Sequence, residues 1–155
     1  MEKICAIILC ILMLLSLAVS PAMAAEVETA ATVEYLPDGS YIVTVVEEQD
    51  THGVRSNTKV GSKTRSYYSA SDVLQWKMTV TGEFLYDGTT ATCTYASGVI
   101  NVVNTSHWEV INESATAGDT TAYYTVTFTL WSLGVPIGDT TYGVSISCDA
   151  NGNLS

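Results

Sequence analysis

Alternation of apolar and polar side chains with a period of two is the feature that most constrains how this chain folds. It is clearest in WKMTVTGEFLY, residues 76–86, where Trp76 and Met78 alternate with Lys77 and Thr79. A period of two places successive side chains on opposite faces of an extended strand, whereas an amphipathic helix needs a period of 3.6. We therefore expect half-buried β-strands rather than helices.

The same alternation recurs between turn signals along the rest of the chain. Proline, aspartate and glycine in residues 37–40 and 87–88 are typical of β-turns and hairpins. About seven to nine short strands favour an all-β, antiparallel β-sandwich of the immunoglobulin-like kind, with a small barrel as the alternative. Immunoglobulin topology stays open, because its core tryptophan lies between two cysteines and Trp76 precedes both candidates. The strand-like runs are VEYL, YIVTVVEE, WKMTVTGEFLY, TTATCTYA, GVINVV, SHWEVI, AYYTVTFTLW and TTYGVSISC.

The start of the chain predicts export. An apolar run from Ile4 to Val19 follows an early lysine and leads to the small-residue site AMA, residues 22–24. This is the pattern of a secretory signal peptide. A transmembrane anchor is the competing interpretation, but the run is shorter than the roughly 20 apolar residues that span a bilayer. We therefore expect residues 1–24 to be a signal peptide and residues 25–155 to be a single secreted, extracellular domain without membrane contact after cleavage.

Two cysteines remain after such a cleavage, Cys93 and Cys148. An even pair in an exported domain predicts one disulfide bond, and both cysteines fall in the inward series of their strands. In the loop-entropy model this bond stabilises the fold by about 4 kcal/mol. Two free buried thiols are the alternative. Metal binding is disfavoured, because the chain has no C-x-x-C motif and no histidine beside either cysteine.

Charge is distributed unevenly along the chain. The sequence holds 16 acidic and 6 basic residues, for a net charge of −10. A chain this acidic has no electrostatic attraction for nucleic acid or for an anionic membrane surface. Residues 49–66, QDTHGVRSNTKVGSKTRS, lack a sustained period and predict a long basic loop, or a loop containing a short edge strand. The candidate contacts of this loop to an anionic polymer are Arg55, Lys59, Lys63 and Arg65.

Motifs for catalysis or metal binding are not found in the sequence. DANGNLS, after Cys148, has its glycine at the fourth position and no later glutamate, so it is not an EF-hand loop, and we expect a polar turn. His52 and His107 lack the spacing of zinc or nucleophilic sites. We therefore predict a protein that is not an enzyme and has no cofactor or metal. A small carboxylate-dependent hydrolase and an inhibitor or bacteriocin-like effector acting through residues 49–66 are the alternatives.

Aromatic residues on strand faces are the candidate binding residues. In AYYTVTFTLW, residues 122–131, Tyr123 and Trp131 fall on the outward face together with three threonines. Flat exposed aromatics stack against sugar rings and also mark protein interfaces. Cover by a neighbouring loop or subunit is the alternative. Tyr67 and Tyr68 are further candidates. We therefore expect a binding or surface-interaction module for an extracellular glycan, a cell-wall polymer or a protein.

Three stretches carry a resemblance to known proteins: W-x-M-T-V-T-G-E-F-x-Y-D-G-T-T-A-T-C-T, a later T-x-T-F-T-L and the terminal C-D-A-N-G-N-L-S. Together they resemble a family of small secreted proteins of Gram-positive, often gut-dwelling, bacteria, which are grouped as domains of unknown function. The resemblance spans roughly residues 60–155. It implies a bacterial, extracellular β domain and brings no catalytic residue to this chain.

Overall fold

The computed structural model describes residues 31–49 and 57–155, which form strands and turns without any helix. It therefore contains no helix in these ranges that is long and apolar enough to cross a membrane. The predicted signal peptide, residues 1–24, lies outside the described residues. The eight strands are β1 (Ala31–Tyr35), β2 (Tyr41–Gln49), β3 (Thr58–Tyr68), β4 (Leu74–Tyr86), β5 (Ala91–Val102), β6 (Trp108–Ala117), β7 (Thr121–Ser132) and β8 (Val135–Ser147).

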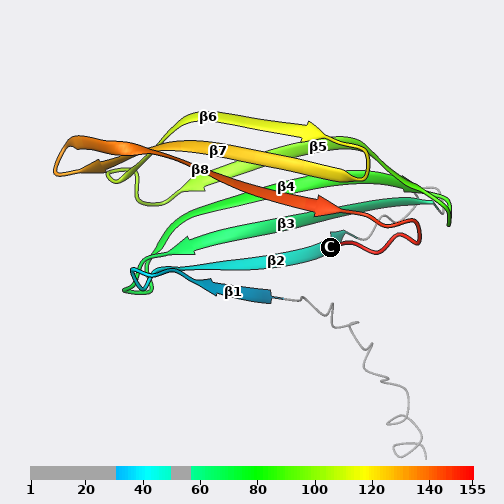
Figure 1. Ribbon diagram of the computed structural model, residues 1–155, viewed down its shortest axis with the longest axis horizontal. Coiled ribbons are helices and arrows are strands. Elements are labelled where there is room, and N and C mark those ends of the chain that lie inside the picture. Colours follow the sequence, from blue (N-terminus) through cyan, green and yellow to red (C-terminus); the bar gives the residue numbers. More distant parts are fainter. Residues whose placement is uncertain (1–30, 50–56) are drawn as a thin grey trace, which may run out of the picture.

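The strands form two antiparallel sheets (Figure 1). One contains β1 to β5 and the other contains β6 to β8, and within each sheet every strand pairs with its neighbour in the sequence. This confirms the all-β prediction. An immunoglobulin domain places strands that are not consecutive side by side in its sheets. Neither sheet does so, and the immunoglobulin-like topology predicted from the sequence is therefore not the one observed. Short turns favour this outcome, because they join strands that can pair directly.

The two sheets form two layers that share one core. β8 lies against β3 and β4, β7 against β4 and β5, and β6 against β5. The smaller sheet therefore covers the β3 to β5 side of the larger one, while β1 lies at the far edge (Figure 1). The alternation predicted for residues 76–86 is confirmed, since Trp76, Met78, Val80 and Phe84 are fully buried.

Aromatic rings fill one end of this core. Trp76 stacks on Phe128 across the two layers with ring centroids 5.5 Å apart, and Trp108 meets both rings at their edges. Tyr67 stacks on Trp76 with a centroid distance of 5.4 Å. Tyr67 is thus a core residue, which corrects its prediction as a binding residue. The reason is its place in the inward series of β3, under the smaller sheet.

At the other end of the core the sheets approach closely at a glycine. A Cβ added to Gly98 of β5 would lie 2.0 Å from Cδ2 of Tyr124, so the tyrosine ring rests directly on the β5 backbone. The Tyr124 hydroxyl donates a hydrogen bond to the carboxylate of Glu113. Burial, together with the neighbouring carboxylate, raises the pKa of Tyr124. The side chain is therefore a neutral hydrogen-bond donor at physiological pH.

Strand β3 corrects the prediction of a long basic loop at residues 49–66. It is the central strand of the five-stranded sheet and pairs with β2 on one side and β4 on the other. Main-chain hydrogen bonds hold a central strand in place whatever its side chains are. Because β8 covers only part of its inner face, several inward positions of β3 carry polar side chains, which hides the period of two. Residues 50–56 lie outside the described residues.

Cys93 and Cys148 are both buried, and both are free thiols in the structure. The disulfide predicted from the sequence is therefore not formed in it. Each sulfur instead donates to a nearby main-chain carbonyl, that of Tyr95 and that of Asp149 respectively. Alternation correctly placed both side chains in the core. Alternation does not predict the distance between the sulfur of Cys93 on β5 and that of Cys148, just after β8. That distance depends on how the two sheets pack against each other.

Candidate functional site

The outer surface of the three-stranded sheet, which we call the β6–β8 face, carries the most distinctive surface chemistry. Strand β7 lies in its middle. The inward side chains of β7, such as Val126 and Phe128, are fully buried, so the alternate series points outward, as the sequence predicts. That outward series is Tyr123, Thr125, Thr127, Thr129 and Trp131. Their partners are Thr116, Ser114, Asn112 and Glu109 on β6, and Ser145, Gly143, Thr141, Asp139 and Pro136 on β8.

Hydrogen bonds order the hydroxyl groups in the middle of the face. The Oγ1 atoms of Thr127 and Thr141 lie 2.9 Å apart, and the Thr129 hydroxyl donates to Asp139 at 2.7 Å. Threonine suits such positions, because its β-branched side chain fits a pleated strand. Each hydroxyl has one donor and two acceptor positions, so a pair bonded to each other still has capacity for a further partner.

The charge of the β6–β8 face is small and negative. Its two carboxylates are both engaged: Asp139 accepts from Thr129, and Glu109 accepts from Nε1 of Trp131 at 2.8 Å. The sequence contains no lysine or arginine after Lys77, so these three strands contribute no positive charge. The face is therefore suited to neutral ligands rather than anionic ones.

A shallow hollow lies beside Tyr123 at one end of the face. Its volume is about 140 Å³, and Tyr123, Thr125, Gly143 and Ser145 are among the residues that line it. Tyr123 is 49% exposed. A Cβ added to Gly143 would come no closer than 3.7 Å to Thr125 Cγ2, so packing does not require glycine there. The missing side chain instead leaves the space beside the tyrosine ring open.

A larger hollow lies beside Trp131 at the other end of β7. It has a volume of about 500 Å³ and adjoins the edge of the face, because Val102 of the other sheet and the inward-facing Trp108 and Val110 line it together with Trp131. Trp108 is buried, and its Nε1 has no hydrogen-bond partner among the described residues. Each of the two outward aromatics of β7 therefore borders a hollow, with a row of threonines between them.

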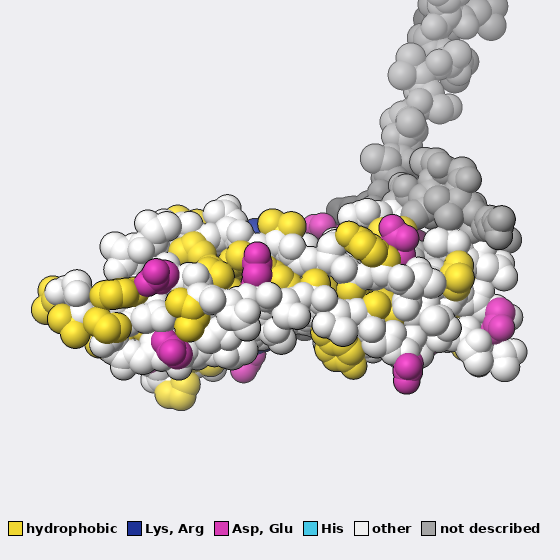
Figure 2. All heavy atoms as spheres, turned by 90° about the horizontal axis from the view of Figure 1, so that it is seen from above, with side chains coloured by type: hydrophobic (Ala, Val, Ile, Leu, Met, Phe, Trp, Pro, Cys, Tyr) yellow, Lys and Arg dark blue, Asp and Glu magenta, His cyan; other side chains and the backbone are white. Residues whose placement is uncertain are grey.

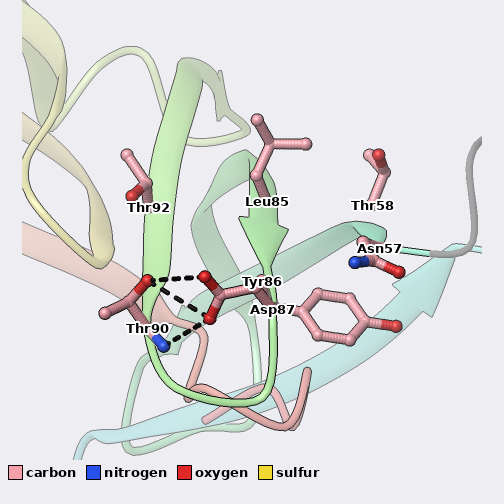
Figure 3. A pocket seen from close by; sticks show the side chains of 7 residues that line it. All are labelled: Asn57, Thr58, Leu85, Tyr86, Asp87, Thr90 and Thr92. Carbon is pink, nitrogen blue, oxygen red and sulfur yellow. Dashed lines mark hydrogen bonds between the residues drawn. The ribbon is translucent and has the colours of Figure 1, made fainter.

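A third hollow, of about 660 Å³, lies at the turn between β4 and β5 (Figure 3). Among the described residues that line it, the one acid is Asp87, whose carboxylate accepts from the amides of Thr89 and Thr90 at 2.8 and 2.7 Å. These bonds lower the pKa of Asp87. A general acid at neutral pH needs a raised pKa instead. Asp87 therefore stabilises the turn, and no second carboxylate lines the hollow among the described residues.

The basic candidates do not gather into a site. Lys59 forms an ion pair with Glu48 on the neighbouring strand. Arg65 donates from Nη1 to the Gly143 carbonyl at 2.7 Å, which connects β3 with β8 across the two layers. Lys63 is half-buried, between Val46 of β2 and Val80 of β4 in the strand register. The remaining one, Arg55, lies outside the described residues. The three described candidates thus lie along one strand, β3, and two of them make structural contacts.

Tyr68 also lies apart from the β6–β8 face. It stacks on Tyr41 with ring centroids 5.0 Å apart, in the five-stranded sheet, and Tyr35 adjoins Tyr41 at 5.6 Å. Of the aromatic candidates, only Tyr123 and Trp131 share one surface. Sequence reasoning did not single out Gly143 or Glu109. The signal for Gly143 was its place at an outward position of TTYGVSISC, where glycine disrupts a run of strand-forming residues.

Comparison with protein-family models, with curated proteins and with solved structures found no match to this chain. Within residues 31–49 and 57–155, no group of three or more histidine, cysteine, aspartate or glutamate side chains is placed to hold a metal ion. The chemistry of the β6–β8 face is therefore the basis for a functional proposal.

Proposed function

We propose that this protein is a secreted, non-enzymatic β-sandwich domain that binds an extended, uncharged glycan on the β6–β8 face. The observation that carries the proposal is the hollow beside each of the two outward aromatics, Tyr123 and Trp131, with hydroxyl groups between them. Secretion rests on the signal-peptide pattern of residues 1–24.

The dimensions of the face favour a polymer over a single sugar. Tyr123 and Trp131 are eight residues apart on β7. At about 3.3 Å per residue in a strand, this separation is about 26 Å. A ligand that contacts both aromatics must therefore be a chain of several sugar rings lying along β7.

The hydrogen-bonding groups of the face favour a neutral glycan. Threonine and serine hydroxyls donate and accept, as sugar hydroxyls do, so the two can exchange hydrogen bonds in either direction. An anionic wall polymer would approach two carboxylates on strands that carry no lysine or arginine of their own, which opposes binding. Among the glycan, wall polymer and protein partners expected from the sequence, the neutral glycan is the best match.

Affinity electrophoresis in gels that contain neutral polysaccharides, such as xylan, mannan and mixed-linkage glucan, tests the proposal. Teichoic acid serves as an anionic comparison. We expect retardation in at least one neutral gel. Replacing the exposed ring by Tyr123→Ala should weaken the affinity about tenfold or more, as loss of an aromatic contact residue typically does. Thr127→Val keeps the shape of the side chain and removes its hydroxyl, and should weaken binding to a smaller extent.

Tyr35→Ala is the matched control, because Tyr35 is an exposed tyrosine on the five-stranded sheet. It should leave the retardation unchanged. Retardation in no neutral gel, or equal losses in the Tyr123 and Tyr35 variants, would exclude the β6–β8 face as a glycan site.

A further inference from the structure

The turn between β7 and β8 has an unusual residue at its tip. Ser132 pairs with Val135, so the connection consists of Leu133 and Gly134 alone. Both have positive φ, 51° and 77°, as in the type I′ turn of tight hairpins. Asparagine, aspartate and glycine suit these positions, whereas a leucine side chain is strained there. Leu133 therefore occupies a turn position at which asparagine, aspartate or glycine would be more stable.

Most of the tip is apolar and exposed. Leu133 is fully exposed, at 103%, while Val135 and Ile137 are 60% and 62% exposed. We call residues 131–137, WSLGVPI, the hairpin tip, and it contains no charged side chain. Figure 2 shows hydrophobic side chains gathered at the end of the molecule where Figure 1 places this turn. Exposed apolar residues on a strained turn give the fold no packing, which points to a role in binding.

The size of the tip argues against a protein partner. A stable protein interface buries about 800 Å² on each side and involves roughly 20 to 30 residues of each partner. The hairpin tip is a projection of seven residues. A projection of this kind is instead well placed to enter the boundary between lipid headgroups and acyl chains, where each buried apolar side chain contributes separately.

The polar groups of the tip also fit a bilayer. The turn has only two residues between paired strands, and Pro136 on the open edge of β8 has no N–H to lose from water. Trp131 lies at the base of the tip with its Nε1 bonded to Glu109. An indole with an apolar ring and a polar edge is typical of the membrane interface.

The negative charge near the tip favours zwitterionic over anionic lipid headgroups. Glu109 and Asp139 lie at the base of the tip, and the chain has no lysine or arginine after Lys77. An anionic bilayer would repel these carboxylates, whereas zwitterionic headgroups would not. We propose that the hairpin tip inserts into the surface of a zwitterionic lipid bilayer. This departs from the expectation that the domain has no membrane contact after cleavage of the signal peptide.

Binding to vesicles of phosphatidylcholine tests the proposal, with flotation to measure the bound fraction and tryptophan emission to report insertion. Trp76 and Trp108 are buried, so a shift in emission reports Trp131. We expect the protein to float with the vesicles and its emission to move to shorter wavelength. Leu133→Asn should lower the partition coefficient about tenfold or more, since it removes a leucine-sized apolar surface from lipid.

The control is Val33→Thr, at a valine that is 50% exposed on β1, the far edge strand of the five-stranded sheet. It should bind vesicles like the unchanged protein. No flotation with phosphatidylcholine, equal partitioning of the Leu133 variant, or binding confined to vesicles rich in phosphatidylglycerol would each overturn the proposal. A lipid-free dimer that dissociates in Leu133→Asn would also overturn it, because the tip would then be a contact between two copies of the chain.

Discussion

At the scale of single residues, Leu133 makes a prediction about stability. Its φ of 51° lies in the left-handed region, which costs a leucine about 1 kcal/mol, and its exposed side chain contributes no packing. Asparagine adopts this conformation readily. Leu133→Asn should therefore raise the free energy of unfolding by about 1 kcal/mol, measured by urea denaturation. A lower stability would mean that the leucine makes a contact the fold depends on.

Asp149 makes a second prediction, on the dependence of stability on pH. Its carboxylate accepts from the amides of Asn151 and Asn153 at 2.8 and 2.9 Å and from Asn153 Nδ2 at 2.7 Å. The bonds to Asn153 are the main reason that the pKa of Asp149 is lowered. A lowered pKa in the folded state stabilises the fold above the ordinary carboxyl pKa, and this contribution is lost as the pH falls through the folded value.

Asp149→Asn should accordingly reduce the free energy of unfolding at pH 7, and the difference from the unchanged protein should shrink as the pH falls below about 4. Urea denaturation at pH 7, 5, 4 and 3 measures this difference. A difference that stays constant over this range would show that the bonded carboxylate charge does not stabilise the terminal turn. CDANGNLS has the composition of a metal loop, but the carboxylate of its aspartate accepts hydrogen bonds from main-chain amides of the turn.

At the scale of strands, the close approach of β5 and β7 makes a prediction. A methyl group at Gly98 would collide with the Tyr124 ring, at 2.0 Å from Cδ2. Gly98→Ala should lower the free energy of unfolding by about 1 to 3 kcal/mol, the usual cost of overpacking a core. Gly143→Ala is the matched control on β8, where the nearest atom is 3.7 Å away, and should leave stability nearly unchanged. Equal thermal shifts in both variants would contradict the packing described for Tyr124.

Strand β3 shows how far sequence reasoning reaches at this scale. β4 and β7 were predictable, because one side of each is buried under the opposite sheet and their sequences alternate accordingly. β3 carries lysine or arginine at positions 59, 63 and 65, which belong to its inward series and are only half-buried. A strand whose inner face is only partly covered has no need to alternate, so its pattern does not distinguish it from a loop.

At the scale of the whole molecule, the core makes a prediction about the two thiols. Cys93 and Cys148 are buried, and burial raises the pKa of both, so little reactive thiolate is present. In the protein cleaved after residue 24, both thiols should react slowly with a thiol reagent and become reactive together when urea unfolds the two layers. Cys93→Ala should leave one reactive group. Absence of any reactive thiol in urea would show that the sulfurs are joined, contrary to the structure.

The sequence by itself determined most of the strands, though not β3, and which side of each faces the core, because a strand with one buried side alternates apolar and polar residues. This is why the outward positions of Tyr123 and Trp131 could be predicted. Only the tertiary structure decided the pairing of consecutive strands into two sheets, the burial of Tyr67, the free state of the two thiols and the hollows beside the aromatics. These depend on how distant segments lie against one another, and side-chain alternation along one strand carries no information about that.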